Sequence, residues 1–366
     1  MTAPHPILVI NAGSSSIKAA VFDAGFEALE TAEASGIGGA GRVRVGTTSE
    51  ACALPDHAGA LSAILDRFVA RGVTLAALAG VGHRVVHGGT DLTAPALITP
   101  RTRAQIAACI PLAPHHNIHH LAAIDAVARL APDLPQTASF DTAFHATNPD
   151  VARRFALPQV AATEGLQRYG FHGTSYAALT RTLPEQTSAP LPERLLGLHL
   201  GNGASLCAIR HGKSVATTMG YSPLSGLTMG TRAGDIDASA VLELARRIGV
   251  EPAAHMLNFE SGLLGLSTLS ADMRSLQEAG TPEAEFARTH FAYWAARHAG
   301  SMIAAMGGLD AIAFTGGIGE NDADMRARIL DHLRWAGDVP VHIVPAREEA
   351  QIAHDTATLL GGLKGR

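Results

Sequence analysis

The sequence predicts an α/β protein of two domains, and three observations carry this prediction. At 366 residues the chain is longer than one hydrophobic core usually supports. Short apolar runs that suit buried strands alternate with helical stretches in both halves. A hairpin pattern at 7–22 recurs at 195–209. A duplicated domain would account for both the recurrence and the length.

The two hairpins share one pattern, an apolar run on each side of a turn rich in small residues: Ile7–Ile10 with Ile17–Phe22, and Leu195–Leu200 with Leu206–Ile209. The predicted register places Gly13 on Gly203 and Ser15 on Ser205.

Apolar spacing of three and four residues predicts helices over Ala58–Ala70, Thr102–Ile110, Glu283–Met306 and Glu348–Leu360. The longest of them carries a stripe that we expect in the core: Phe286, Phe291, Trp294, Ile303 and Met306. The three prolines of Pro184–Pro192 predict a surface connection, and Val341–Pro345 predicts the last strand.

Composition excludes several classes of protein. A net charge of −5 and a pI near 6.4 give no reason to expect a nucleic-acid partner. The N-terminus does not have the pattern of a signal peptide, and no apolar run is long enough for a membrane span. Three widely spaced cysteines fit a reducing compartment rather than a metal site. We therefore expect a cytoplasmic protein without membrane attachment.

Three loops rich in glycine or serine each follow an apolar strand, at 11–18, 201–205 and 314–321. Small residues let backbone N–H groups approach phosphate oxygens, and Lys18 adds a positive charge. A single such loop is more often an ordinary turn, and the first is not a Walker A sequence. Three of them together favour a nucleotide ligand.

Four charged or titratable residues stand in glycine-rich or strand-end contexts: Arg84, Asp141, His172 and Arg232. Taken singly, either arginine fits a structural ion pair, and the histidine fits a buried core position.

Seven segments, in this order, resemble the acetate kinase family, which includes propionate and butyrate kinases: VINAGSSSIKAAVFD, GHRVVHGG, FDTAFH, RYGFHGTS, HLGNGAS, GYSPLSGLTMGTRAGDID and TGGIGEN. The resemblance covers residues 7 to about 356. It implies the duplicated fold of actin, sugar kinases and heat-shock ATPases, with a nucleotide held between domains. The implied domains are 1–143, completed by the helix 349–366, and 144–348. The resemblance also implies a homodimer.

Family roles carried over by motif imply catalytic Asp141, His172 and Arg232, and a substrate site of Arg84, Val86, His115, Phe171 and Pro223. The implied ATP-binding residues are Ser14, Ser16, Lys18, His199, Leu200, Gly201, Asn202, Gly203, Asp272, Met273, Arg274, Gly317, Ile318, Gly319, Glu320 and Asn321. Asn11 and Glu348 match the residues of a site for Mg²⁺, or Mn²⁺ in its place.

The chain departs from the family pattern at three places. His115 stands where the family has a leucine of the substrate pocket, Arg347 where it usually has Asn, and Met273 where it has Phe. The chain is also shorter than the family between Phe22 and Val81. His115 puts the size and polarity of the substrate in doubt. The run His115, His116, His119 and His120 could also be read as a metal cluster.

The resemblance implies an acetate kinase, which moves the γ-phosphoryl group of ATP directly to acetate and leaves ADP. The acceptor carboxylate is already ionised near neutral pH, so the reaction needs no general base to form the nucleophile. A kinase of propionate or of another short, even hydroxylated, acid is the alternative within enzymes. A nucleotide-binding scaffold would have lost Arg84, His172 and Arg232, and a sugar kinase would need a base beside a neutral hydroxyl.

Overall fold

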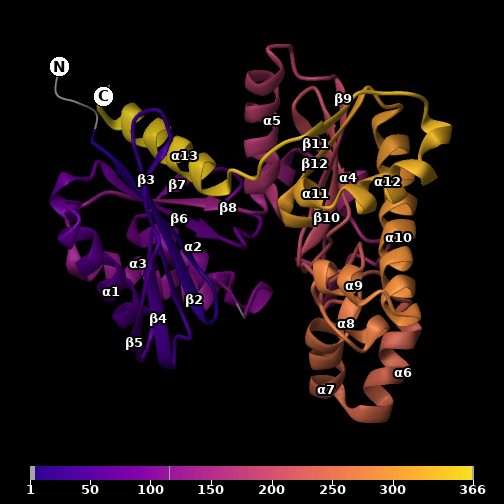
Figure 1. Ribbon diagram of the computed structural model, residues 1–366, viewed down its shortest axis with the longest axis horizontal. Coiled ribbons are helices and arrows are strands. Elements are labelled where there is room, and N and C mark those ends of the chain that lie inside the picture. Colours follow the sequence, from indigo (N-terminus) through magenta and orange to yellow (C-terminus); the bar gives the residue numbers. More distant parts are fainter. Residues whose placement is uncertain (1–4, 115, 365–366) are drawn as a thin grey trace. The chain divides into compact units, whose positions relative to one another are not determined.

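The computed structural model describes residues 5–114 and 116–364. The chain forms two compact units, residues 1–144 with 347–366 and residues 145–346 (Figure 1). The C-terminal helix therefore belongs to the same unit as the N-terminal half of the chain. Each unit is described by itself below.

The first unit is built on an eight-stranded sheet in the order β5-β4-β3-β2-β1-β6-β8-β7. Its strands are β1 (Ile7–Ala12), β2 (Ser16–Phe22), β3 (Ala28–Ser35), β4 (Gly39–Val45), β5 (Thr48–Leu54), β6 (Gly80–Val85), β7 (Ala96–Leu97) and β8 (Gln136–Phe140). Its helices are α1 (His57–Ala70), α2 (Pro100–Ala108), α3 (Asn117–Leu130) and α13 (Glu348–Lys364). Strands β1, β6 and β8 are parallel neighbours, whereas β1 to β5 are joined by antiparallel hairpins.

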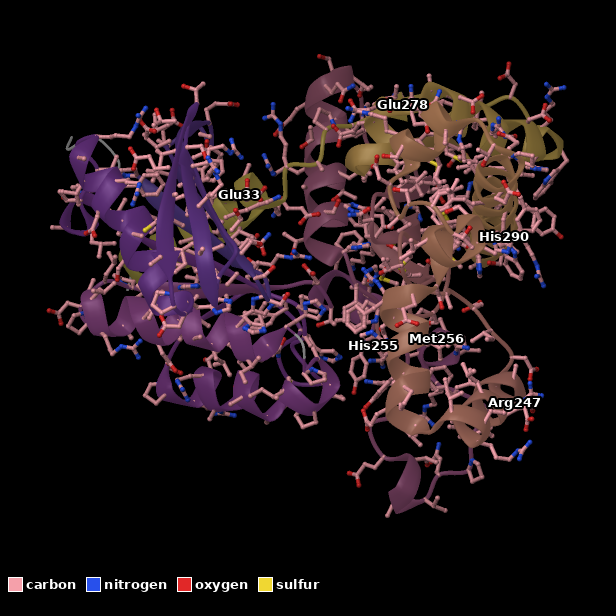
Figure 2. The ribbon with its side chains drawn as sticks, turned by 60° about the horizontal axis from the view of Figure 1, so that its bottom comes forward. Glu33, Arg247, His255, Met256, Glu278 and His290 are labelled. Carbon is pink, nitrogen blue, oxygen red and sulfur yellow. The ribbon has the colours of Figure 1, made fainter. Side chains whose placement is uncertain are left out.

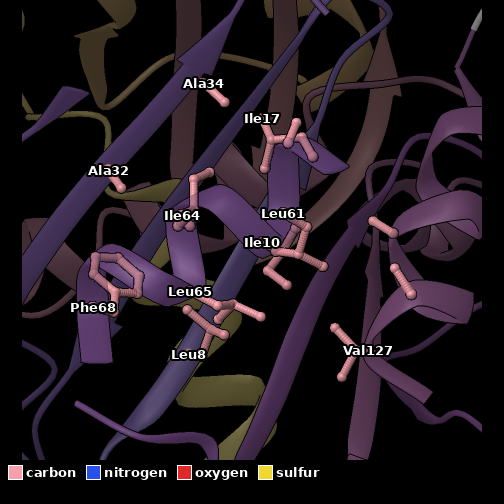
Figure 3. Close-up of a cluster of buried hydrophobic side chains, with 14 of the residues drawn as sticks. Leu8, Ile10, Ile17, Ala32, Ala34, Leu61, Ile64, Leu65, Phe68 and Val127 are labelled. Carbon is pink, nitrogen blue, oxygen red and sulfur yellow. The ribbon is translucent and has the colours of Figure 1, made fainter. Parts of the chain in front are cut away.

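Successive side chains of a strand point to opposite faces of the sheet, and helices cover both faces over β1 and β2. Figure 3 shows the core on one face, where side chains of β1 and β2 pack against α1 and α3: Leu8, Ile10, Ile17, Leu61, Ile64, Phe68 and Val127. On the other face Val9 and Phe22 pack against Ile352 and Ala353 of α13. The sheet therefore holds the ends of β1, β6 and β8 in fixed positions.

The second unit has a five-stranded sheet in the order β11-β10-β9-β12-β13. Its strands are β9 (Arg194–Leu200), β10 (Ala204–Arg210), β11 (Lys213–Thr217), β12 (Ala311–Thr315) and β13 (Val341–Ile343). Its helices are α4 (Asp150–Arg153), α5 (Gly173–Thr187), α6 (Ala238–Ile248), α7 (Val250–His255), α8 (Gly262–Ser267), α9 (Met273–Ala279), α10 (Pro282–Met306), α11 (Gly316–Asn321) and α12 (Ala323–His332).

The two sheets repeat one topology. In the first unit β3-β2-β1-β6-β8 are joined antiparallel, antiparallel, parallel and parallel, and β11-β10-β9-β12-β13 follow the same sequence of pairings. This is the duplicated actin-like ATPase fold, so the predicted fold class is confirmed.

The predicted register between the hairpins is wrong by two residues. Strand β1 ends at Ala12 and β2 begins at Ser16, while β9 ends at Leu200 and β10 begins at Ala204. Each turn thus has three residues, and Gly13 corresponds to Gly201 rather than to Gly203. Matching small residues by type misled the prediction, because the turns share length and not the positions of their glycines and serines.

Two further expectations need correction. Pro184 lies inside α5, which continues to Thr187, because buried Leu183 anchors the last turn despite the missing proline N–H. In the stripe of α10, Phe291, Ile303 and Met306 are buried, but Phe286 is 57% exposed and Trp294 only partly buried. Helical spacing identifies a face of the helix but not how far its neighbours extend along it.

None of the helices among the described residues is long and apolar enough to span a bilayer.

Candidate active site

Three polar residues of the first unit meet at one edge of its sheet. Asn11 is near the end of β1, Arg84 near the end of β6, and Asp141 directly follows β8. Because these three strands are parallel neighbours, their carboxyl ends lie side by side. Residues far apart in the sequence are thereby brought within hydrogen-bonding distance.

Arg84 is at the centre of this group. Its Nη2 donates to Oδ2 of Asp141 at 2.6 Å, its Nε lies 3.2 Å from both Asp141 oxygens, and its Nη1 lies 3.4 Å from Oδ1 of Asn11. Burial opposes the charge of Arg84, but Asp141 and Glu348 outweigh this effect and raise its pKa. The guanidinium is therefore held both charged and oriented.

Glu348 brings a second carboxylate to the group from the first turn of α13. Its Oε2 lies 4.0 Å from Nε of Arg84. Burial raises the pKa of Glu348 to about 7; Arg84 opposes this shift, whereas Asp141 and Glu349 add to it. The carboxylates of this group therefore exceed the positive charge that Arg84 can offer them.

The remaining predicted residues of the first unit lie around this group or on the hairpin. Val86 is buried just after β6, and the next residue, His87, exchanges backbone hydrogen bonds with the side chain of Asn117 at 3.2 and 2.9 Å. Ser14 and Ser16 are at the β1–β2 turn. Lys18 lies in β2, on the rim of a hollow of about 320 Å³ that Arg44 and Glu349 also line.

In the second unit the structure brings His172 and Arg232 together against Gly203. A β-carbon added to Gly203 would lie 3.0 Å from Nη2 of Arg232 and 3.1 Å from Nε2 of His172. Nη1 of Arg232 donates to the carbonyl oxygen of Pro223 at 2.6 Å. A side chain at position 203 would therefore displace at least one of these two nitrogen atoms by a few tenths of an ångström.

Arg232 is a partly buried cation that has no ion-pair partner in the described part of the chain. No carboxylate lies within ion-pair distance of it among residues 5–114 and 116–364, and burial lowers its pKa. An arginine nevertheless keeps its proton. An unpaired buried charge is costly, so a position of this kind suits the binding of an anion.

His172 belongs to a pair of stacked imidazoles. Its ring lies 4.2 Å from that of His199, with an angle of 28° between the planes. Serine hydroxyls contact both Nδ1 atoms, Ser205 Oγ that of His172 at 2.9 Å and Ser175 Oγ that of His199 at 2.8 Å. The sequence contained these serines within the motifs HLGNGAS and FHGTS but gave no reason to assign them to the site.

The predicted nucleotide-binding stretches of the second unit meet around a hollow of about 460 Å³, which is within the range of ligand pockets. Its lining includes Gly201, Asn202, Asp272, Met273, Arg274, Gly317, Ile318 and Asn321. Asp272 also caps α9 by accepting from the backbone of Ser275, and this bond lowers its pKa.

Several predicted residues of these stretches do not line the hollow. Glu320 turns back to accept hydrogen bonds from the backbone N–H groups of Gly316 and Ala346, at 3.0 and 2.9 Å. Gly319 is buried against Phe314. Leu200 is buried in β9, and its backbone oxygen would lie 2.8 Å from a β-carbon at Gly316, whose φ is +80°. These residues shape the loop rather than face the hollow.

The structure describes every residue expected to line the acid pocket except His115. Phe171 is buried in the second unit, where its carbonyl oxygen lies 2.9 Å from Nε2 of His145. Pro223 contacts Arg232 as described. His115 lies outside the described residues. Within the described part of the chain, no group of three or more His, Cys, Asp or Glu side chains is arranged to hold a metal ion.

A duplicated actin-like fold with a hollow of nucleotide size and partly buried arginines that suit anionic groups defines the class of the protein, a phosphotransferase. A family model described as the acetokinase family matches residues 6–356, and the chain belongs to that family. Its reaction type is therefore that of a kinase with a carboxyl group as acceptor.

Known proteins resemble the chain over almost its whole length. It is 40% identical to acetate kinase of Nitrobacter hamburgensis, over 97% of this chain and 96% of that protein. It is 44% identical to propionate kinase of Citrobacter rodentium, over 91% of this chain and 86% of that protein. The crystal structure of Porphyromonas gingivalis acetate kinase superposes with a TM-score of 0.90 at 32% identity, covering 97% of this chain and all of that one.

Proposed function

We propose that the protein is an acetate kinase that transfers the γ-phosphoryl group of ATP reversibly to acetate. Arg232 is partly buried, has no carboxylate partner among the described residues and lies next to His172 at the glycine loop of Gly203, and this is the observation that supports the function most directly. A phosphoryl group in transfer carries negative charge on its three equatorial oxygens, and fixed positive donors stabilise it.

The reaction is a direct in-line displacement. An oxygen of the acetate carboxylate forms a bond to the γ-phosphorus while the bond from that phosphorus to the β-phosphate oxygen breaks, and ADP leaves. Arg84 binds the acceptor carboxylate, and Arg232 and His172 donate to the phosphoryl oxygens. Asp141 is fully engaged with Arg84, so its role is to orient the guanidinium rather than to remove a proton.

The donor set at Asn11 and Glu348 fits Mg²⁺, with Mn²⁺ as a substitute. An amide oxygen and a carboxylate are hard ligands, and Mg²⁺ typically takes only one or two carboxylates from a protein beside phosphate oxygens. Burial is the main cause of the raised pKa of Glu348, and Asp141 and Glu349 add to it, so a bound divalent cation would favour the ionised carboxylate. When bound, the ion would neutralise phosphate charge during transfer.

Acetate is proposed as the preferred acid because Val86, Phe171 and Pro223 supply the apolar residues that a small methyl group requires. Propionate remains the alternative, since a propionate kinase is among the similar proteins. The deciding experiment measures acyl phosphate as hydroxamate with acetate, propionate, butyrate and glycolate. The highest kcat/KM with acetate is expected, whereas a preference for glycolate would point to a pocket that hydrogen-bonds its substrate.

A homodimer is proposed on the evidence of α6. None of the eleven residues of this helix is buried, although Leu242 and Ile248 are large and apolar. Val250, just beyond, is 71% exposed, and Arg247 points into solvent (Figure 2). An amphipathic helix normally buries its apolar side, so we propose that a second copy of the chain covers it.

We propose a cytoplasmic location, where the three free cysteines stay reduced.

A further inference from the structure

The imidazole of His57 bonds to the turn between β1 and β2. This turn consists of Gly13, Ser14 and Ser15, and Ser14 is one of the residues expected to bind ATP. Nε2 of His57 lies 2.7 Å from the carbonyl oxygen of Gly13, although 44 positions separate the two residues in the sequence. A carbonyl oxygen can only accept a hydrogen bond. Nε2 of His57 therefore carries a hydrogen and donates it to Gly13.

The two helices next to the turn fix the position of His57. His57 is the first residue of α1, and Asp56 caps this helix by accepting from the backbone N–H of Gly59 at 2.7 Å. The imidazole of His57 stacks on that of His119 in α3, with 4.5 Å between the ring centres and 21° between the ring planes. The residue is buried. A donor held in this way keeps the carbonyl of Gly13 in one orientation.

The orientation of this carbonyl decides where the next N–H group points. The described residues contain no cis peptide bond, and in a trans peptide the C=O and N–H groups point in opposite directions. Helix α1 packs on the face of the sheet to which Ile17 points, whereas Asn11 and Lys18 point to the opposite face. The N–H of Ser14 is thus directed away from α1, toward the side of Asn11 and Lys18.

This N–H group is available to a ligand. In the described part of the chain it has no acceptor within hydrogen-bonding distance, and Ser14 is exposed. Other bonds fix the rest of the turn: Gly13 N–H donates to the carbonyl of Ser16 at 2.7 Å, and the carbonyl of Ser15 accepts from Ile37 at 3.1 Å. Backbone N–H groups in turns bind phosphate oxygens, and a hydrogen bond to the carbonyl of the same peptide group makes its N–H a stronger donor.

We propose that His57 is a positioning residue for the nucleotide. Its Nε2–H holds the Gly13 carbonyl toward α1 and thereby presents the N–H of Ser14 to a phosphate oxygen of ATP. His57 acts through the turn and does not itself contact the nucleotide. The binding of phosphate at this turn rests on the proposed function, whereas the hydrogen bond from His57 to Gly13 does not.

The test separates the hydrogen bond of His57 from the stacking of its ring. His57→Gln keeps a donor near the position of Nε2 but has no ring, while His57→Phe keeps a ring and has no donor. Calorimetry of the full-length variants measures the affinity for ATP, and competition with ATP measures that for adenosine, which has no phosphate. His57→Phe should bind ATP ~10-fold more weakly than the parent, about the effect of one hydrogen bond to a charged group, and adenosine equally well. His57→Gln should bind both almost as tightly as the parent.

Two further variants complete the design. His57→Leu lacks both ring and donor and should behave like His57→Phe, so it decides the question if the longer phenyl ring prevents folding. His5→Leu is the matched control and should bind ATP like the parent, because it removes a bond from an exposed histidine to a backbone carbonyl, that of Ala77.

Three results would overturn the role of His57. These are normal ATP binding in both His57→Phe and His57→Leu, equal losses of ATP and adenosine affinity, and weak ATP binding in His57→Gln beside normal binding in His57→Phe. The last result would show that stacking on His119 matters instead. If the variants show the expected order of ATP affinities but the parent phosphorylates no acid, the proposed function is refuted and the role of His57 stands.

Discussion

Asp141 holds Arg84 by one edge of its guanidinium. Nη2 donates at 2.6 Å to one carboxylate oxygen, while Nε lies 3.2 Å from both. Asp141 is 2% exposed and Arg84 is 21% exposed, so this pair is shielded from water on the aspartate side only. The arginine keeps Nη1 directed toward Asn11 and available to an anion.

Asp141→Asn tests this orienting role. The amide preserves the shape of the side chain but loses the charge and places an NH₂ group where an oxygen accepted. Misplacement of a binding group by about 1 Å can reduce the rate ~100-fold, so a loss of at least this size in kcat/KM for acetate is expected. ATP binding, measured by calorimetry, should be unchanged.

Asp125→Asn is the control for that variant, because it breaks a comparable arginine–aspartate pair, with Arg103, on the surface. It should behave like the parent protein. Acetate kinetics of Asp141→Asn within a few-fold of the parent would show that Arg84 does not depend on its partner.

Gly203→Ala tests the close approach of the two donors in the second unit. The new methyl group would lie 3.0 Å from Arg232 Nη2 and 3.1 Å from His172 Nε2, so at least one donor must move. We expect a fall in kcat of more than tenfold with almost the same melting temperature. Gly361→Ala in α13, where a β-carbon meets nothing within 4 Å, is the matched control. Full activity in Gly203→Ala would mean that these donors do not act at this loop.

Arg232→Lys keeps a positive charge at the same place but loses the planar arrangement of donors. Lysine has no second nitrogen to bond the Pro223 carbonyl while another faces the phosphoryl group. Loss of a directed arginine costs ~10³–10⁵ in the rate of phosphoryl transfer, and a drop of that order in kcat is expected while ATP still binds. Arg334→Lys, in an exposed side chain, provides the comparison. Near-normal turnover of a folded Arg232→Lys protein would remove this residue from the mechanism.

The sequence was informative where a function depends on a short contiguous motif. Arg84, Asp141, His172 and Arg232 could each be proposed as site residues because small residues or strand ends surround them, and the alternation of elements predicted the fold class. Their pairing was not predictable. That Asp141 binds Arg84 depends on β6 and β8 being neighbours, which a linear pattern does not specify.

The failures have equally physical reasons. Hydrogen bonds link Tyr176 of α5 through Ser205 of β10 to His172. The sequence did not predict them, because there Tyr176 and Ser205 are ordinary residues of a helix and a strand. The exposure of Phe286 was missed because spacing along a helix does not say where the next element ends. For Glu320 the motif was recognised, but its role in capping a backbone turn appears only in three dimensions.

The last prediction concerns pH and Glu348. Its pKa in the folded protein is raised from 4.5 to about 7, so the folded metal-free protein binds a proton that the unfolded chain has released. The stability contributed by this proton is complete below pH 4.5 and is lost as the pH rises through about 7. A shift of this size corresponds to roughly 3 kcal/mol. In the presence of EDTA, the unfolding free energy of the parent should therefore fall as the pH rises between these values, and that of Glu348→Gln should fall less.

Because Mg²⁺ would require the ionised carboxylate, its apparent affinity in the parent should weaken below pH 7, and Glu348→Gln should bind it weakly at every pH. Urea unfolding and Mg²⁺ titrations at pH 5, 6, 7 and 8 measure both effects, with Glu50→Gln on exposed β5 as control. Parallel pH curves for the parent and Glu348→Gln would show that this carboxylate neither retains the proton nor binds the metal.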